Sequence, residues 1–314
     1  MDKKKNNWKA WLYLLPAIAL LLIFTVWPII NTVRISFMVD QNGDPYNVAK
    51  EMNPYGMYQF HFGFENYKAV FDAKQSNFGR YLGTTLLLTV LTVPISTMLA
   101  LVIAVALNSI KWLKKIFQTV FFLPYVTNTI AIGMVFMVMF QSQTLGYGMG
   151  VINSLITALG GKAINWVDLG SKYAENITVL VIYIVWNALP FKILVLLGGL
   201  QSVNKQYYDA AKIDGTSRFR TFWRVTVPLV SPMISYVVIT GFIGGFKEYT
   251  SVVGIFGEAM GGSQNLVNTM VGYIYDSISG HTEGVASAAA IILFMIIFAV
   301  TMLNLYVSKK KVHY

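Results

Sequence analysis

Polar and aromatic side chains interrupt several long apolar runs of this sequence. Polar groups inside such runs are costly to bury and usually face a cavity or a partner group. Amide and charged side chains can hydrogen-bond the hydroxyl groups of a ligand, and flat aromatic rings can stack on its C–H faces. We therefore predict a ligand pathway. Its candidate residues are Tyr125, Asn128, Trp186, Asn187, Phe191, Lys192, Phe246, Lys247, Glu248 and Tyr249.

A structural role is the alternative for Lys192 and Glu248. They lie in different apolar runs, so they can form an ion pair that fixes the packing of two helices without contacting a ligand. Lys247 cannot replace Lys192 in such a pair, because Lys247 and Glu248 are adjacent in sequence and do not face each other on one helix. Both interpretations stay open from the sequence.

A polar, basic loop at residues 201–228 carries a second set of candidates. Ser202 or Asn204 can cap a first short helix, and Gly215 can end it in the left-handed conformation. Thr216 can then cap a second helix, whose aromatic residues recur at three- and four-residue spacing among arginines. The candidate docking residues are Asp209, Ala210, Ala211, Asp214, Gly215, Phe219, Phe222 and Trp223.

The aromatic and arginine content of loop 201–228 is typical of an interaction element. Large aromatic residues and Arg dominate interface energies, so a rigid helix pair of this kind fits a groove on a protein partner. The alternative is an amphipathic helix that lies on an anionic membrane surface, which Trp and Arg suit equally.

The composition indicates an integral membrane protein. Hydrophobic residues make up 55% of the 314 residues and charged residues only 12%, a balance unlike that of soluble domains. The net charge of +10 does not indicate nucleic-acid binding, because the basic residues flank apolar runs. The sequence has no Cys, which excludes disulfides, thiolate catalysis and Cys-ligated metals.

Six apolar runs are close to the length that a helix needs to cross a bilayer. The first extends from about Trp11 to Ile30; it is too long for a removed signal peptide, and no cleavage site follows it. The other runs are centred near Leu91, Ala131, Val185, Ile239 and Leu293. We therefore predict an all-α, polytopic membrane protein with six transmembrane helices.

The basic residues predict the orientation of these helices. Alternate segments between the runs hold 15 of the 24 Lys and Arg residues, and such residues are enriched in cytoplasmic loops. Both termini and loop 201–228 are therefore expected in the cytoplasm. The predicted organisation is an N-terminal tail (1–10), a first span (11–37), an extracytoplasmic loop that can form a small cap (38–80), a core of five spans that includes loop 201–228 (81–308), and a C-terminal tail (309–314).

Loop 201–228 resembles the EAA loop of permeases from type I binding-protein-dependent ABC importers. The matching positions are Asp209, Ala210, Ala211, Asp214, Gly215, Phe222, Val225, Val227 and Pro228. Asp209 stands where Glu is usual, Thr216 where Ala is usual, and Asn204 where Pro often begins the helix; these changes keep the chemistry or the capping role. Weaker features along nearly the whole chain, such as Phe122-Leu123-Pro124, resemble the carbohydrate branch, which includes maltose transporters.

The resemblance implies a transport subunit and its partners. The chain would be the permease that carries a sugar or oligosaccharide across a bacterial cytoplasmic (inner) membrane, with loop 201–228 docked on an ATPase. It implies a second, related permease subunit, two ABC ATPase subunits that bind ATP and Mg, and an extracytoplasmic solute-binding protein. The chain itself would bind no cofactor.

No catalytic or metal-binding set is predicted. The histidines are His61, His281 and His313, all outside the apolar runs, and no nucleophile-elbow, metalloprotease or phosphate-loop motif is present. One alternative is an importer of another solute, a glycerol phosphodiester or a polyol, and two lysines lining a cavity would favour an anionic one. A second is an ion-coupled secondary transporter, for which Glu248 is the only candidate carboxylate.

Overall fold

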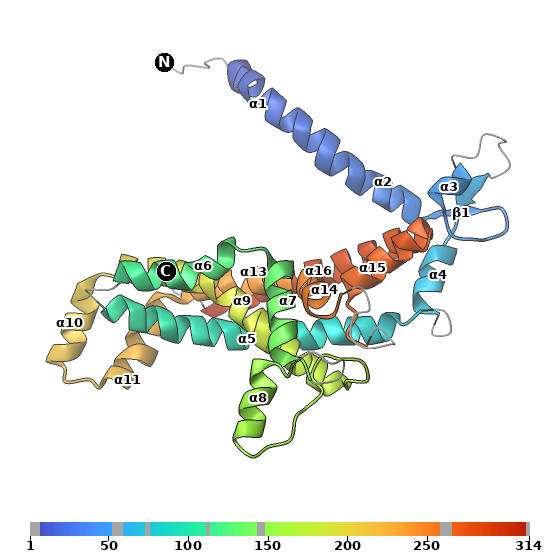
Figure 1. Ribbon diagram of the computed structural model, residues 1–314. Helices are drawn as coiled ribbons and strands as arrows, with labels where there is room; N and C mark the ends of the chain where they lie inside the picture. Colours follow the sequence, from blue (N-terminus) through green and yellow to red (C-terminus); the bar gives the residue numbers. More distant parts are fainter. Residues whose placement is uncertain are drawn as a thin grey trace, which may run out of the picture. The chain divides into compact units, whose positions relative to one another are not determined.

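The computed structural model describes residues 7–51, 59–72, 76–110, 114–142, 148–257 and 266–311. This part is mostly helical (Figure 1), which confirms the predicted all-α class. Its elements are α1 (Asn7–Leu21), the π-helical η1 (Leu22–Val26), α2 (Trp27–Ser36), β1 (Met38–Asp40), α3 (Val48–Glu51), β2 (Phe60–Phe62), α4 (Glu65–Phe71), α5 (Phe78–Ser109), α6 (Lys114–Val126), α7 (Thr129–Phe140), α8 (Val151–Ala158), α9 (Tyr173–Ser202), α10 (Lys205–Ile213), α11 (Arg218–Thr221), the π-helical η2 (Phe222–Thr226), α12 (Val227–Leu229), α13 (Ser231–Phe246), α14 (Thr250–Phe256), α15 (Met270–Ser279) and α16 (Glu283–Lys311).

Within the described residues, four helical segments are long and apolar enough to cross a membrane. They are Trp11–Ser36, Phe78–Ser109, Tyr173–Ser202 and Glu283–Lys309. Two bent helix pairs, Gln118–Val126 with Thr129–Phe140 and Arg218–Leu229 with Ser231–Phe246, raise the number to six if each pair is one span. This agrees with the six predicted spans. Residues 1–6 and 312–314 of the predicted tails lie outside the described residues.

The third and fifth predicted spans are each broken into two helices. The third bends by 102° between α6 and α7, where Asn128 has an extended backbone and its side chain caps α7 by accepting from the amides of Ile130 and Ala131. The fifth bends by 70° at Val230, and Pro232 lies in the first turn of α13. A capping side chain and a proline each favour a new helix start over continuation.

The chain divides into two compact units. Unit 1 comprises residues 1–79 and 273–295, and unit 2 comprises residues 80–272 and 296–314. In unit 1, β1 and β2 form an antiparallel two-stranded sheet, and the buried side-chain amide of Asn66 donates to the carbonyls of Ser36 and Met38 at 3.0 and 2.9 Å. Segment 38–80 therefore contains a folded structure.

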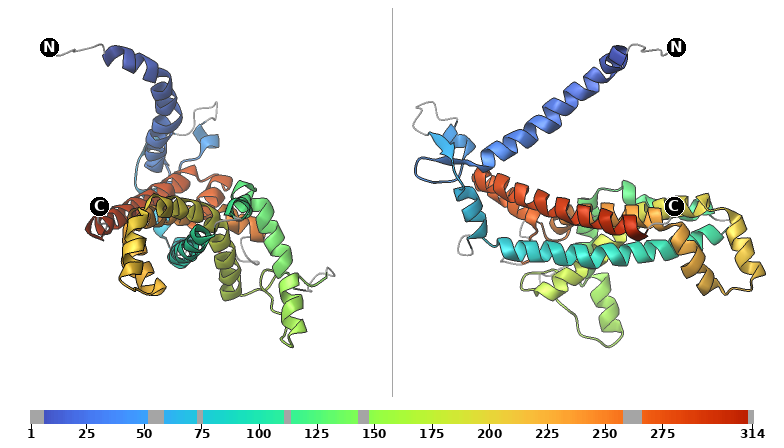
Figure 2. Two further views of the ribbon diagram at one scale, coloured as in Figure 1. Left: turned by 90° about the vertical axis from the view of Figure 1, so that its left-hand side faces the viewer. Right: turned by 180° about the vertical axis from the view of Figure 1, so that it is seen from behind.

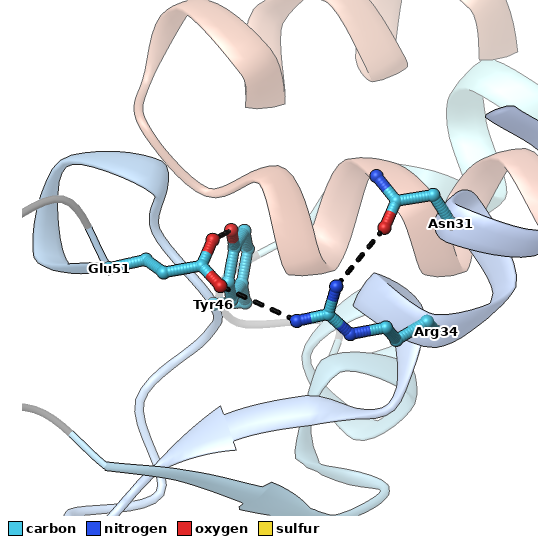
Figure 3. Close-up of polar contacts among 4 residues, drawn as sticks. All are labelled: Asn31, Arg34, Tyr46 and Glu51. Carbon is cyan, nitrogen blue, oxygen red and sulfur yellow. Dashed lines mark hydrogen bonds and ion pairs between the residues drawn. The ribbon is translucent and has the colours of Figure 1, made fainter.

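A polar network links α2 to the segment that follows β1 in unit 1 (Figure 3). Arg34 forms an ion pair with Glu51 at 3.4 Å and donates to Asn31. Glu51 also accepts a hydrogen bond from the hydroxyl of Tyr46. Burial of Tyr46 and this bond to a carboxylate raise the pKa of the Tyr46 hydroxyl to about 12.

Unit 2 contains two apolar clusters. The first joins α7, α9 and α14 around Tyr183 and Ile255, and the second joins α5, α9 and α13 around Leu196 and Val237. In the first cluster, α7 and α14 lie very close together: a Cβ added at Gly133 would lie 2.7 Å from the backbone of Gly254. Small residues allow such close helix approach in membranes.

Candidate transport cavity and coupling loop

A cavity of about 400 Å³ lies among the helices of unit 2. Five of the predicted pathway residues line it: Tyr125, Asn187, Phe191, Lys192 and Glu248. The remaining walls come from residues that the sequence analysis did not select: Thr92, Val93, Ser96, Thr129, Ile184, Ala188, Thr240, Gly241, Gly244 and Gly245. The cavity thus combines aromatic faces with polar groups, the arrangement typical of small-molecule sites.

Helix α5 supplies a buried stripe of hydroxyl side chains beside this cavity. Thr85, Thr89, Thr92 and Ser96 follow one another at three- and four-residue spacing, and each donates to the carbonyl four residues earlier in the helix. This back-bonding satisfies the hydroxyl donors within α5. The spacing was visible in the sequence, but Thr and Ser are too common in membrane helices for it to stand out.

Lys192 on α9 is 4% exposed and is held by α5. Its ammonium donates to the carbonyl of Val93 at 3.2 Å, to Ser96 Oγ at 2.7 Å and to Thr97 Oγ1 at 2.9 Å. An ammonium has three N–H donors, so these bonds use all of them. Lys192 therefore joins α9 to α5. It lines the cavity, but all three of its N–H groups are already engaged by α5.

Glu248 follows the end of α13 and caps the next helix. Its Oε1 accepts from the amide of Ser251 at 3.1 Å, and its backbone carbonyl accepts from Thr269 at 2.7 Å. Within the described residues, no ion pair joins Glu248 to Lys192. The alternative of an interhelical ion pair is therefore not found in the part of the chain that the structure describes: two α5 hydroxyls and an α5 carbonyl, rather than a carboxylate, accept from the ammonium.

Five predicted pathway residues do not line the cavity. Asn128 is exposed and serves as the cap of α7, and Lys247 is exposed where α13 ends. Phe246 is buried, while Trp186 and Tyr249 pack against the first apolar cluster. Aromatic type alone did not separate packing residues from cavity residues, since both environments favour large flat side chains.

Loop 201–228 folds as two helical segments, α10 and then α11 with η2, as predicted. Asn204 caps α10 by accepting from the amide of Gln206 at 3.0 Å, and Gly215 follows α10 with a φ of +65°. Asp209 and Lys212 form an exposed ion pair at 3.1 Å. Figures 1 and 2 show α10 and α11 at the end of unit 2 where α9 ends, away from α8.

The cap of the second helix differs from the prediction. Ser217, not Thr216, accepts from the amide of Arg220, at 3.3 Å. Thr216 Oγ1 instead donates to the carbonyl of Ala211 at 2.6 Å, which ties the turn to the last residues of α10. The two hydroxyl residues are neighbours, so their spacing could not decide between them.

The predicted docking residues divide between exposed and packed positions. Phe219 is 75% exposed, whereas Phe222 packs against the second apolar cluster. Phe219, Phe222 and Trp223 also line an apolar groove of about 340 Å³ with Met98, Leu101, Val102 and Val105 of α5. Ala211 is buried. Ile213, which the sequence analysis did not select, is 86% exposed at the end of α10.

Comparison with known proteins gives one family match. The family described as "Binding-protein-dependent transport system inner membrane component" matches residues 93–313. The matched segment contains the cavity residues of α6, α7, α9 and α13 and all of loop 201–228.

Individual relatives and a solved structure agree with this family. The chain is 29% identical over 310 residues to the multiple sugar-binding transport system permease protein MsmF of Streptococcus mutans, with 98% of each chain covered. It is 32% identical over 226 residues to the arabinooligosaccharides transport system permease protein AraP of Halalkalibacterium halodurans, covering 70% of this chain and 67% of that one. The fold matches a chain of a bacterial ABC transporter that imports the acidic polysaccharide alginate, with a TM-score of 0.76, 21% identity and coverage of 97% and 96%.

Proposed function

This chain belongs to the family of inner membrane components of binding-protein-dependent transport systems, and we propose that it carries a sugar or oligosaccharide across the cytoplasmic membrane as one permease subunit of an ATP-driven importer. As a family member, it is a multi-pass transport subunit rather than an enzyme. The substrate class is supported by relatives whose names refer to multiple sugars and to arabinooligosaccharides.

The helix–Gly215–helix geometry of loop 201–228 is the observation that carries this proposal. It presents exposed apolar side chains, Ile213 and Phe219, on two short capped helices directly after the long helix α9. Exposed large apolar residues on a rigid element favour a protein groove as partner. A movement of that partner can be transmitted through α9 to the cavity, because Asn187, Phe191 and Lys192 of α9 line the cavity.

The complete importer would contain a second, related permease subunit, two ABC ATPase subunits and an extracytoplasmic solute-binding protein. ATP and Mg would bind to the ATPase subunits, which dock on loop 201–228. Both termini would then lie in the cytoplasm, with segment 38–80 on the opposite side of the membrane. The high density of Lys and Arg in the alternate segments supports this orientation.

A matched pair of surface substitutions tests the coupling role. The chain is co-expressed with its neighbouring subunits, and ATPase activity is measured with binding proteins loaded with candidate sugars. Phe219→Glu should abolish stimulation by the loaded binding protein, because a carboxylate would enter an apolar interface. Leu159→Glu, at a residue that is 87% exposed beyond α8, should leave the basal ATPase activity and the binding of the ATPase subunits unchanged. Stimulation that survives Phe219→Glu would contradict the proposal.

A further inference from the structure

An apolar groove of about 340 Å³ lies between α5 and the aromatic side chains of α11 and η2, and every side chain that lines it is apolar. We call it the α5–η2 groove. The ring of Trp223 meets those of Phe219 and Phe222 in T-shaped contacts, with centroids 6.3 and 5.1 Å apart. On the opposite wall, Met98 and Val102 are exposed. Exposed apolar side chains that line one groove mark a site for an apolar occupant.

Both walls of this groove belong to segments that are apolar enough to lie in a membrane. Helix α5 coincides with the candidate span Phe78–Ser109, and the groove lies toward the end of that span. The segments α11 and η2 begin the bent span that starts with Arg218–Leu229. In the orientation of the proposed function, on which this inference rests, the end of α5 and loop 201–228 both face the cytoplasm. The groove then lies at the level of the cytoplasmic leaflet, where Trp side chains such as Trp223 are enriched.

Three arginines accompany the aromatic wall of the groove. Arg220 and Arg224 are four residues apart, which places them on one side of the helix, and Arg218 lies one position before the aromatic residues. All three are exposed, and within the described residues none forms an ion pair, not even with the nearby Asp214. No Asp or Glu occurs in residues 215–247 or in α5. The groove is therefore bordered by positive charge that no carboxylate of these segments neutralises.

We propose that the α5–η2 groove binds one anionic phospholipid of the cytoplasmic leaflet, with an acyl chain in the groove and the phosphate on Arg220 and Arg224. An apolar groove beside guanidinium groups matches the two ends of such a lipid, and Arg binds phosphate oxygens with paired N–H donors. A protein helix that filled the groove would have to place carboxylates at the membrane to match the arginines, and carboxylates are rare there. The bound lipid would contact both α5 and η2 and thereby stabilise the attachment of loop 201–228 to the membrane-spanning helices.

Photolabelling of the complete transporter tests this site. The transporter, with its ATPase subunits, is reconstituted without ATP into phosphatidylcholine vesicles that contain a small fraction of a lipid probe. The probe is phosphatidylglycerol, or phosphatidylcholine for comparison, with a photoactivatable diazirine in one acyl chain. After irradiation, labelled peptides are identified by mass spectrometry. The phosphatidylglycerol probe should label residues 98–105 or 219–223 about tenfold more strongly than the phosphatidylcholine probe, because each arginine near a membrane surface favours an anionic headgroup.

Three double variants and one groove-filling variant show which features select the lipid. Arg220→Gln with Arg224→Gln should reduce labelling by the phosphatidylglycerol probe to the level of the phosphatidylcholine probe. Arg220→Lys with Arg224→Lys keeps both charges and should retain most of the preference. The control, Lys205→Gln with Lys212→Gln, removes the same number of charges from exposed positions of α10 and should leave the preference unchanged. Val102→Trp should lower labelling by both probes, because the larger side chain fills the groove.

Three results would overturn the proposal. Equal labelling of the groove by both probes in the wild type would show that only bulk lipid lies there. Labelling that spares the groove would indicate that a protein segment occupies it. A preference that survives the loss of Arg220 and Arg224 would show that these arginines do not select the lipid. The wild-type comparison decides between the first two results even if a variant fails to assemble. Because the assay contains no ATP, none of these results bears on the importer function, which stimulation of the ATPase tests separately.

Discussion

Gly215 shows how a single residue sets the geometry of loop 201–228. Its φ of +65° is left-handed, and a Cβ at this position would meet no described atom within 4 Å. The cost of a side chain is therefore a backbone cost, about 1 kcal/mol for Ala and less for Asn, which tolerates this conformation. We expect Gly215→Ala to reduce stimulated ATPase activity several-fold and Gly215→Asn to reduce it less.

Gly198 provides the matched control for Gly215. It lies inside α9, and among the described residues a Cβ there also meets nothing within 4 Å. Since Ala has the higher helix propensity, Gly198→Ala should leave the activity unchanged. Equal losses in Gly198→Ala and Gly215→Ala, measured in the same ATPase assay, would show that the left-handed turn has no special role.

Tyr46 gives unit 1 a pH-dependent contribution to stability. Its folded pKa of about 12 lies above the ordinary value of 10.0 for a Tyr hydroxyl, so the neutral hydroxyl is favoured in the folded state. The resulting stabilisation is complete below about pH 10 and is lost between about pH 10 and pH 12. Tyr46→Phe should lower the free energy of unfolding by about 1 kcal/mol at neutral pH, through loss of the bond to Glu51.

Thermal unfolding of wild type and Tyr46→Phe across pH checks this contribution. The difference between their melting temperatures should stay constant below about pH 10 and shrink toward pH 12. A difference that does not change with pH would show that ionisation of Tyr46 is not linked to folding.

At the residue level, the sequence predicted which side chains line the cavity better than it predicted the hydrogen-bond partners of those side chains. Asn187, Phe191, Lys192 and Glu248 stood out because polar and aromatic groups are conspicuous in apolar runs, and all four line the cavity. The sequence left open whether Lys192 pairs with Glu248, since a charge suggests an opposite charge, whereas Ser96 and Thr97 accept hydrogen bonds from its ammonium here. A Ser or Thr hydroxyl that donates to a carbonyl of its own helix cannot be distinguished, from the hydropathy pattern, from a hydroxyl that binds another helix.

Among the elements, α7 and α14 depend on a glycine contact. A Cβ at Gly133 would lie 2.7 Å from the Gly254 backbone, which cannot move aside as a flexible side chain could. Gly133→Ala should therefore destabilise the protein by about 1–3 kcal/mol through overpacking. Gly244→Ala in α13 is the control, because a Cβ there meets nothing within 4 Å in the part of the chain that the structure describes. Thermal unfolding of both variants measures the difference. Equal melting temperatures would show that the close approach of Gly133 to Gly254 does not require glycine.

The sequence predicted which helical spans exist, but it did not predict how sharply two of them bend. Apolar runs of spanning length gave the six predicted spans, and Asn204 and Gly215 gave the ends of α10. The 102° bend at Asn128 was not predicted. Asn128 was assigned to the ligand pathway because it is polar, but its side-chain Oδ1 caps α7 by accepting from the amides of Ile130 and Ala131. To decide whether Asn128 contacts a ligand or caps a helix, one must know where the helix starts, and the periodicity of apolar residues alone does not show this.

For the whole molecule, composition predicted an integral membrane protein, and the residues of loop 201–228 indicated the family resemblance. The family match over residues 93–313 agrees with that resemblance. The division into two units was not predicted, because unit 1 combines residues 1–79 with residues 273–295, which are remote in sequence. Contacts such as the bond from Asn47 Nδ2 to the His281 carbonyl at 2.8 Å join these segments and have no local sequence signal.

Site-specific cross-linking tests the docking of loop 201–228 on an ATPase most directly. The chain has no Cys, so a single cysteine at Ile213, which is 86% exposed, reports only on its own position. In the complete transporter, Ile213→Cys should cross-link to an ATPase subunit through a short bifunctional reagent. Leu159→Cys, equally exposed beyond α8, should not. Cross-linking of the ATPase to Leu159→Cys but not to Ile213→Cys would contradict the account.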